Sequence, residues 1–312
     1  MSAIIHRQHL YQQIPSGSGL ELSAGKLYLI GDDSPLLYVL DPASLRQTGS
    51  IRLFASKDFD SGRIPKMRKP DLECLTQLRI NGVNSLVAFG SGSTDRRNRC
   101  FTIALPASPQ ARPQVREHSL KNLYAALQAD QELLGGEVLN LEAAATTPDH
   151  LLLLQRAAGE GPNLMLAFPR QEFAAYLEGR RREPPAYASL PFRLPELAGQ
   201  RARFSGATVH GQRLFFTASV ENTDDAIQDG EVLGSFIGWV DLADLKPGNK
   251  ALEAPTLQVQ NQQGETYKGK VESLVILDSP RAGIYRALAI TDNDQGQSEL
   301  LEVELNTIPS KK

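Results

Sequence analysis

The chain has few cysteines, no long apolar run and little excess charge. Its two cysteines, Cys74 and Cys100, exclude a framework of several disulfides and a cysteine-rich zinc site. No stretch approaches the ~20 consecutive apolar residues that cross a bilayer, and the first residues lack the uninterrupted apolar segment of a secretory signal. The net charge of -3 gives no general attraction to nucleic acid or to anionic lipid. We therefore expect a soluble cytoplasmic protein with neither a nucleic-acid partner nor a membrane partner.

What the sequence does contain is a short phrase that recurs. Residues 71–76 read Asp-Leu-Glu-Cys-Leu-Thr, and related phrases stand at 140–145 (Asn-Leu-Glu-Ala-Ala-Ala) and 270–275 (Lys-Val-Glu-Ser-Leu-Val). Weaker copies at 203–208 and 17–20 carry a serine in place of the glutamate. Each copy is followed, across a turn, by a second apolar run. Self-similarity at a long period is typical of repeat architectures.

The spacing of the copies predicts the fold. The anchors lie near residues 18, 73, 142, 205 and 272, and each interval can hold several strands of about 5–6 residues. We expect one all-β domain over residues 1–312, a five-bladed β-propeller, with six blades as the alternative. The last repeat offers only three strands. We therefore expect residues 3–11 to supply its fourth strand and to close the ring.

Two local patterns add detail to this architecture. Asn81-Gly82 lies between two apolar runs and predicts a tight hairpin turn. Further along, apolar residues recur at helical spacing from Leu120 to Leu134 and predict one amphipathic helix that ends at Gly135 and Gly136.

Propeller topology brings several polar residues to one end of the channel. The first strand of each blade lines the channel, and it begins at the face where the second strand ends. Glu73, Glu142 and Glu272 stand at starts of first strands. The ends of second strands carry further polar residues, which are Asp32, Asp33, Ser91, Ser93, Arg156, Glu221 and Asp292. We expect all of these at one mouth of the channel.

Three carboxylates round a narrow axis repel one another unless a cation, a proton or a basic side chain lies among them. One interpretation is a divalent metal ion such as Ca²⁺ held by Glu73, Glu142 and Glu272. A second is a metal-free polar pocket. A third is pairing of each glutamate with a basic neighbour, the candidates being Lys69, Arg156, Arg203 and Lys270.

The three glutamate phrases, together with Thr-Asp-Asn-Asp at 291–294, resemble an uncharacterised bacterial β-propeller family. They are more distantly similar to phytase-like esterase propellers and to gluconolactonase-type propellers. The resemblance covers most of the chain as a blade pattern, and the glutamates are its specific part. It implies a divalent ion at Glu73, Glu142 and Glu272. The sequence departs from this pattern at Ser18 and Ser205, where further carboxylates would stand.

Two functions are compatible with these residues. The first is a hydrolase acting on a small anionic ester, phosphoester or lactone, in which a metal polarises the substrate and lowers the pKa of a bound water. Asp292 or Asp32 would then be the base, and Arg156 would hold the anion. The alternative is a non-catalytic platform that binds a ligand or a protein, because propellers host many unrelated functions.

Overall fold

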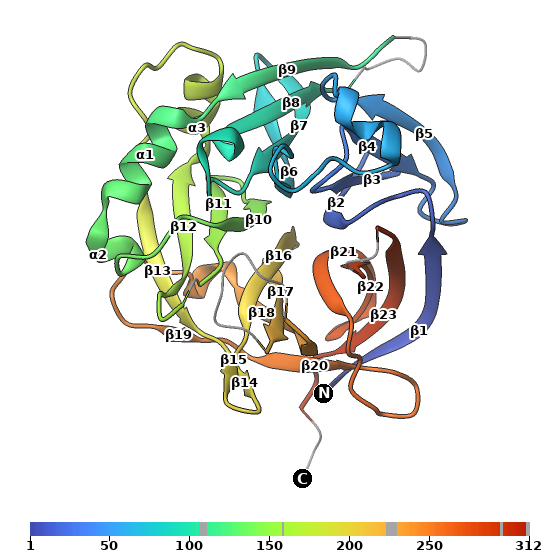
Figure 1. Ribbon diagram of the computed structural model, residues 1–312. Coiled ribbons are helices and arrows are strands. Elements are labelled where there is room, and N and C mark those ends of the chain that lie inside the picture. The colour runs from blue at the N-terminus through green and yellow to red at the C-terminus, as the bar shows by residue number, and fades with distance from the viewer. Residues whose placement is uncertain (106–110, 158, 223–229, 294–295, 310–312) are drawn as a thin grey trace.

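The strands follow one another as antiparallel meanders arranged round a central axis (Figure 1). The computed structural model describes residues 1–105, 111–157, 159–222, 230–293 and 296–309. The first meander is a four-stranded sheet of β2 (Gly17–Ser23), β3 (Lys26–Gly31), β4 (Leu36–Leu40) and β5 (Gln47–Arg52). The second contains β6 (Leu72–Ile80), β7 (Val83–Gly90), β8 (Arg99–Ala104) and β9 (Gln114–Ser119).

The third meander gains a strand from a distant part of the chain. It contains β10 (Leu141–Thr146), β11 (His150–Gln155), β12 (Asn163–Pro169) and β13 (Ala188–Arg193). The short strand β19 (Leu252–Glu253) pairs in parallel with the outer edge of β13. A separate hairpin of β14 (Glu196–Leu197) and β15 (Gln200–Arg201) leads into the next meander. Among the described residues, the connections contain the 3₁₀ turns η1 (Lys57–Ser61), η2 (Asp95–Arg97) and η3 (Leu242–Asp244).

The two ends of the chain meet in one eight-stranded sheet. One half of it is β16 (Arg203–His210), β17 (Arg213–Glu221), β18 (Val232–Asp241) and β20 (Thr256–Gln260). The other half is β21 (Lys270–Arg281), β22 (Ile284–Asp292), β23 (Ser298–Asn306) and the N-terminal β1 (Ser2–Tyr11). The antiparallel pairing of β1 with β23 runs from Ser2 opposite Asn306 to Tyr11 opposite Ser298, so the predicted pairing of the N-terminal stretch is confirmed. An unpredicted parallel contact of β1 with β20 joins the halves.

A β-bulge recurs at the same place in the strands that carry the repeated phrase. In β2, β6, β10, β16 and β21 the pairing register shifts across one residue near the start of the strand. The skipped residues are Ser18, Glu73, Glu142, Ser205 and Glu272. A bulge leaves its extra residue out of the ladder and re-aims its side chain. The repeated phrase in the sequence is therefore the signature of a repeated backbone irregularity.

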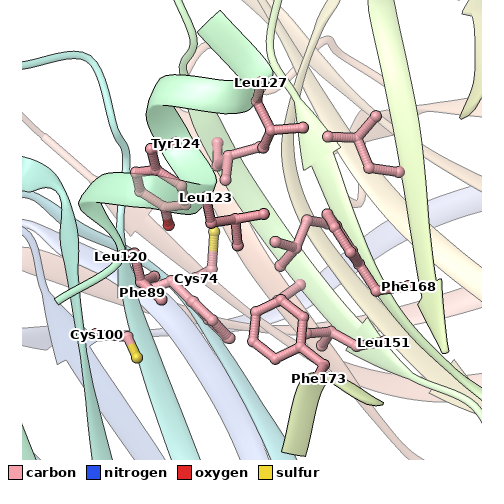
Figure 2. Packing of buried hydrophobic residues seen from close by; sticks show 14 of the residues in the cluster. Cys74, Phe89, Cys100, Leu120, Leu123, Tyr124, Leu127, Leu151, Phe168 and Phe173 are labelled. Atoms are coloured by element: carbon pink, nitrogen blue, oxygen red, sulfur yellow. The ribbon is translucent and has the colours of Figure 1, made fainter. Parts of the chain in front are cut away.

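Helices fill the space between the second and third meanders. Helix α1 (Lys121–Ala129) buries Leu123, Tyr124 and Leu127 in a cluster with Cys74 and Phe168 (Figure 2). The Tyr124 hydroxyl donates a hydrogen bond of 2.9 Å to the carbonyl of Gly90. Cys74 is 1% exposed, as expected of a small core residue on the strand face opposite its neighbours.

The prediction of a single helix from Leu120 to Leu134 is wrong in one respect. The helix breaks at Asp130, whose backbone is not helical, and α2 (Gln131–Leu134) follows it. The Asp130 carboxylate accepts a hydrogen bond of 3.0 Å from the Leu133 amide and so caps the new helix. The predicted end is confirmed, because Gly135 terminates α2 in the left-handed conformation.

Two further features complete the fold. Asn81 and Gly82 have φ angles of 49° and 76°, and Ile80 pairs with Val83, so the predicted hairpin turn is confirmed. Helix α3 (Arg170–Leu177) follows β12 and buries Phe173 against Phe89 and Phe168. Within the described ranges, no helix has the length and apolar character that a membrane span requires.

Candidate functional site

The starts of the innermost strands and the ends of their neighbours carry a cluster of buried charges. Register places Leu72 opposite Gly90, Leu141 opposite Gln155, and Lys270 opposite Asp292. We call the charged residues at this end of the strands the axial cluster, which comprises Asp32, Lys69, Asp71, Glu73, Glu142, Arg156, Glu221, Lys270, Glu272 and Asp292. It includes every residue that the sequence analysis assigned to catalysis or to metal binding.

The carboxylates of the cluster influence one another electrostatically. The charges of Asp71 and Asp292 help to raise the pKa of Asp32, and the charge of Glu142 helps to raise those of Glu73 and Glu272. The structure therefore brings the predicted residues together at one end of the axis. It divides them into two groups with different partners.

The first group is organised around Asp71. Its backbone has a φ of 55°, which is uncommon for a residue with a side chain. The Asp71 carboxylate accepts a hydrogen bond of 2.6 Å from Ser91 Oγ, and it lies 3.1 Å from Lys69 Nζ and 2.7 Å from an Arg97 guanidinium nitrogen. The Lys69 ammonium also contacts the Asp32 carboxylate. Lys69 thus joins two acidic residues that come from different sheets.

Asp32, Asp71 and Glu73 are positioned as a set of metal ligands. Each offers a carboxylate oxygen, and these oxygens lie within 4.8 Å of one another. Oδ1 of Asp32 is buried and has no hydrogen-bond donor among the described residues. Within the same part of the chain, the Glu73 carboxylate makes neither a hydrogen bond nor an ion pair. Buried acceptors without donors are costly, so this oxygen-rich set fits a hard divalent cation.

The protonation of this group follows from its burial. Desolvation raises the pKa of Asp32 to about 7, opposed by the Lys69 charge and assisted by Asp33, Asp71 and Asp292. Desolvation also raises the pKa of Glu73 well above its usual range, and the nearby charge of Asp71 adds to the effect. Without a bound cation, burial therefore disfavours the ionised form of both carboxyls.

The second group is an ion-paired network. Lys270 Nζ lies 2.9 Å from Glu272 Oε1 and 3.5 Å from Glu221 Oε1. The Arg156 guanidinium pairs with the same Glu221 carboxylate. Glu142 Oε1 accepts a hydrogen bond of 2.7 Å from the side-chain Nδ2 of Asn140. The pairing of Lys270 with Glu272 matches the interpretation in which a glutamate of the repeated phrase pairs with a basic neighbour.

The network shifts the pKa values of its two acids, Glu221 and Glu272, in opposite directions. Burial acts to raise the pKa of Glu221, but the charges of Arg156 and Lys270 outweigh it and lower the pKa to about 2. Burial raises the pKa of Glu272 to about 8, although Lys270 opposes the change. Glu272 Oε2 is buried and has no hydrogen-bond donor among the described residues. The basic partners thus favour the ionised form of Glu221, whereas burial disfavours the ionised form of Glu272.

The residues with predicted roles fall into different groups of the axial cluster. Of the three glutamates predicted to hold a metal, Glu73 belongs to the oxygen triad, whereas Glu142 and Glu272 belong to the second group. Arg156, predicted to hold an anion, already pairs with Glu221. Asp292 is half-buried at the end of β22. Asp294, the last residue of the 291–294 phrase, lies outside the described residues.

Sequence reasoning missed Asp71 as a candidate ligand and gave Lys69 only a pairing role. The sequence contains a signal for Asp71, which is that all three glutamate phrases begin with a polar residue. The corresponding residues in the other two phrases are Asn140 and Lys270. All three precede the bulged glutamate by two residues, and all three make polar contacts in the axial cluster. The position two residues before each glutamate is thus as much a part of the site as the glutamate.

Solved structures with a similar fold span nearly the whole chain. Glutaminyl cyclase of Myxococcus xanthus is 11% identical, with 99% of this chain and 98% of that chain covered, at a TM-score of 0.52. The α-L-arabinanase of Cellvibrio cellulosa complexed with arabinohexaose is 12% identical, with 97% and 92% covered, at a TM-score of 0.46. The GH43 endo-arabinanase of Bacillus licheniformis is 12% identical, with 94% of each chain covered, at 0.44. At such low identity the likeness concerns the fold alone, which is all-β and of the propeller class.

Comparison of sequences gives a family and no function. No curated protein matches this chain. A family model does match residues 13–305, which is nearly the whole chain, and its description is a family of unknown function, DUF6929. The chain therefore belongs to the family of unknown function DUF6929.

Proposed function

We propose that this protein is a five-bladed propeller that hydrolyses a small anionic ester, phosphoester or lactone at its axial cluster, with a divalent cation bound by Asp32, Asp71 and Glu73. The observation that carries the proposal is the convergence of three carboxylates from two sheets, two of them with oxygens that no described residue satisfies. The resemblance to esterase and lactonase propellers noted in the sequence points to the same reaction class.

The blade count is supported by the repeated bulge. Five innermost strands each carry one bulge near their start, and each is followed by an antiparallel neighbour. The eight-stranded sheet then consists of two blades that β1 joins, because β1 is the outer strand of one and also touches the outer strand β20 of the other.

A cation in the triad would offset the burial that disfavours the ionised forms of Asp32 and Glu73. Ca²⁺ accepts six to eight oxygen ligands in flexible geometry, which suits carboxylates from a turn and from a bulged strand. Such an ion supplies a Lewis acid for the substrate carbonyl or phosphoryl group. Lys69, which contacts Asp32 and Asp71, limits the net charge of the triad when no ion is bound.

The remaining residues of the cluster would handle the substrate and its protons. Asp292 lies near enough to Asp32 to raise its pKa, and it would accept a proton from the attacking water. Glu272 has a pKa of about 8 and would donate a proton to the leaving group. Arg156 and Lys270 would orient the anionic part of the substrate from the other side of the axis.

A non-catalytic binding site is the second candidate. The observation that favours it is the mutual satisfaction of the second group, in which Arg156 and Lys270 already have a carboxylate partner in Glu221. In such a network Arg156 and Lys270 would exchange Glu221 for a polar ligand and bind it without catalysing a reaction.

Thermal unfolding with added cations separates these candidates. In chelator-treated protein we expect one of Ca²⁺, Mg²⁺, Mn²⁺ or Zn²⁺ to raise the melting temperature, because only the folded ring assembles the ligands. Asp32→Asn and Glu73→Gln should remove this shift, whereas the matched change Glu142→Gln should retain it. Loss of the shift in Glu142→Gln alone would instead favour the ligand set Glu73, Glu142 and Glu272.

Hydrolysis is then measured on aryl esters, aryl phosphates and lactones with the cation that shifts the melting curve. Activity that disappears in Glu73→Gln and in Glu272→Gln, with circular dichroism unchanged, would support the enzyme. If all four cations leave the melting curve of the parent unmoved, the metal-dependent hydrolase is ruled out and the binding site is preferred.

A further inference from the structure

Two hollows lie at the opposite end of the strands from the axial cluster. The first, of about 340 Å³, lies between the β6–β7 turn and helix α3. The second, of about 540 Å³, extends from there along Asn84 and the β10–β11 turn at 146–148. Arg79 and Arg170 line both hollows, so the two form a continuous groove around these side chains. We call it the arginine groove.

The groove carries uncompensated positive charge. Arg79, Arg170 and Arg180 line it, and Glu178 is the one acid among its described lining residues. The Glu178 carboxylate is already used, because one oxygen accepts a hydrogen bond of 2.5 Å from the Asn81 amide and the other contacts Arg180. Within the described part of the chain, the guanidinium groups of Arg79 and Arg170 have no acidic partner. The lining therefore has an excess of two positive charges on a protein whose net charge is -3.

Rigid elements fix the backbone positions from which these arginines project. Arg79 lies opposite Asn84 in the hairpin ladder, close to the turn that contains Asn81. Arg170 begins α3, and its amide donates a hydrogen bond of 2.8 Å to the Asp149 carbonyl. The bond from Asn81 to Glu178 ties the hairpin to the far end of α3. Phe173 anchors the helix, because it is fully buried. The walls of the groove are thus fixed relative to one another.

We propose that the arginine groove binds a small phosphorylated molecule. Guanidinium groups present N–H donors in a planar fork that matches phosphate oxygens in pairs. Two of them without acidic partners, on one groove, fit a phosphomonoester or a diphosphate better than they fit a carboxylate. The volumes of the hollows lie in the range that small-molecule sites occupy, and Asn84 offers an uncharged donor for the rest of the ligand. This site is separate from the axial cluster, so it stands whether or not the hydrolase exists.

Calorimetric titration with inorganic phosphate and with pyrophosphate, at constant ionic strength, tests the proposal. We expect saturable binding, tighter for pyrophosphate because it can span both arginines. Arg79→Gln and Arg170→Gln should each weaken it about tenfold or more, since each removes a charged hydrogen bond. The matched control is Arg52→Gln, because Arg52 is an exposed arginine on β5 outside the groove; it should bind like the parent.

Three outcomes would overturn this site. The first is the absence of saturable binding by either anion. The second is equal weakening by Arg52→Gln, which would indicate unspecific attraction. The third is loss of binding in Arg156→Gln with Arg79→Gln unaffected, which would place the anion at the axial cluster. Circular dichroism of each variant checks that a loss of binding is not a loss of fold.

Discussion

Ser205 Oγ donates a hydrogen bond of 2.6 Å to the carbonyl of Val271, the residue directly before Glu272. Ser18 does the same for the next strand in the ring, since its Oγ donates to the carbonyl of Leu72, directly before Glu73, at 2.5 Å. The serine copies of the repeated phrase therefore support the backbone beside two of the glutamates. They are positioning residues, which explains how a serine can occupy the place of a carboxylate without breaking the repeat.

We expect Ser205→Ala to lower the free energy of unfolding by about 1 kcal/mol, because a buried hydrogen bond to a backbone carbonyl is lost. The loss is moderated by Ser219 Oγ, which lies 3.2 Å from the same carbonyl. Urea unfolding measures the effect. Ser50→Ala is the matched control, since Ser50 lies exposed on β5, and its stability should equal that of the parent. A Ser205→Ala protein as stable as the parent would contradict the supporting role.

Replacement of Gly82 tests the hairpin turn without disturbing any packing. Gly82 has a φ of 76°, and a Cβ added there would meet nothing within 4 Å. We expect Gly82→Val to cost about 1 kcal/mol or more, because a β-branched residue is strained at positive φ. A Cβ added at Gly49 would also meet nothing within 4 Å, but Gly49 does not have a positive φ. Gly49→Val should therefore be neutral or stabilising in the same urea experiment, and equal losses at both positions would refute a conformational cause.

Removal of residues 1–8 tests closure of the ring. These residues contribute most of the pairing between β1 and β23 and both parallel pairs with β20. The truncated protein keeps Tyr11, whose hydroxyl is bonded to the Leu45 carbonyl. We expect a sharp fall in the melting temperature, because two strand edges lose their partner and Ala3 and Ile5 leave the core. An unchanged melting temperature would show that the two halves of the eight-stranded sheet hold together without β1.

The architecture could be predicted because each sheet repeats the same local signals. The phrases around Glu73, Glu142 and Glu272 mark strands that are buried on both faces, and turn residues such as Asn81-Gly82 separate them from their partners. The break in the helix at Asp130 was not predicted. There, a side chain able to cap a helix competes with continuation of the helix, and spacing of apolar residues carries no information about that competition.

The site could be predicted only in part. Topology brought the right residues to one end of the axis, because strand starts and strand ends alternate regularly. Which side chains contact one another depends on local backbone geometry and on contacts between distant segments. Examples are the bulge that re-aims Glu73 and the pairing of Arg156 with Glu221, which lies 65 residues further along the chain. Neither the bulge nor contacts between neighbouring sheets follow from the pattern of apolar residues. The choice of Asp32 and Asp71 as companions of Glu73 therefore needed the structure.

The raised pKa of Glu272 predicts a dependence of stability on pH. The pKa of this carboxyl is about 8 in the folded protein and 4.5 as its ordinary value. Between these values the folded state holds a proton that the unfolded state has lost, so stability falls as pH rises through this window and then levels off above it. Asp32, with a folded pKa of about 7, contributes a fall of the same sign.

Glu272→Gln cannot titrate, so it should remove one part of this decline. We compare the free energy of unfolding of the variant with that of the parent at each pH. The value for the variant minus the value for the parent should increase by on the order of 1 kcal/mol or more from pH 5 to pH 8.5. Urea unfolding in chelator at several pH values measures it. Glu132→Gln is the matched control, because Glu132 is exposed, and its curve should follow that of the parent. A Glu272→Gln curve parallel to the parent across the whole range would show that Glu272 is ionised in the folded protein, and Lys270 would then be its full counter-charge.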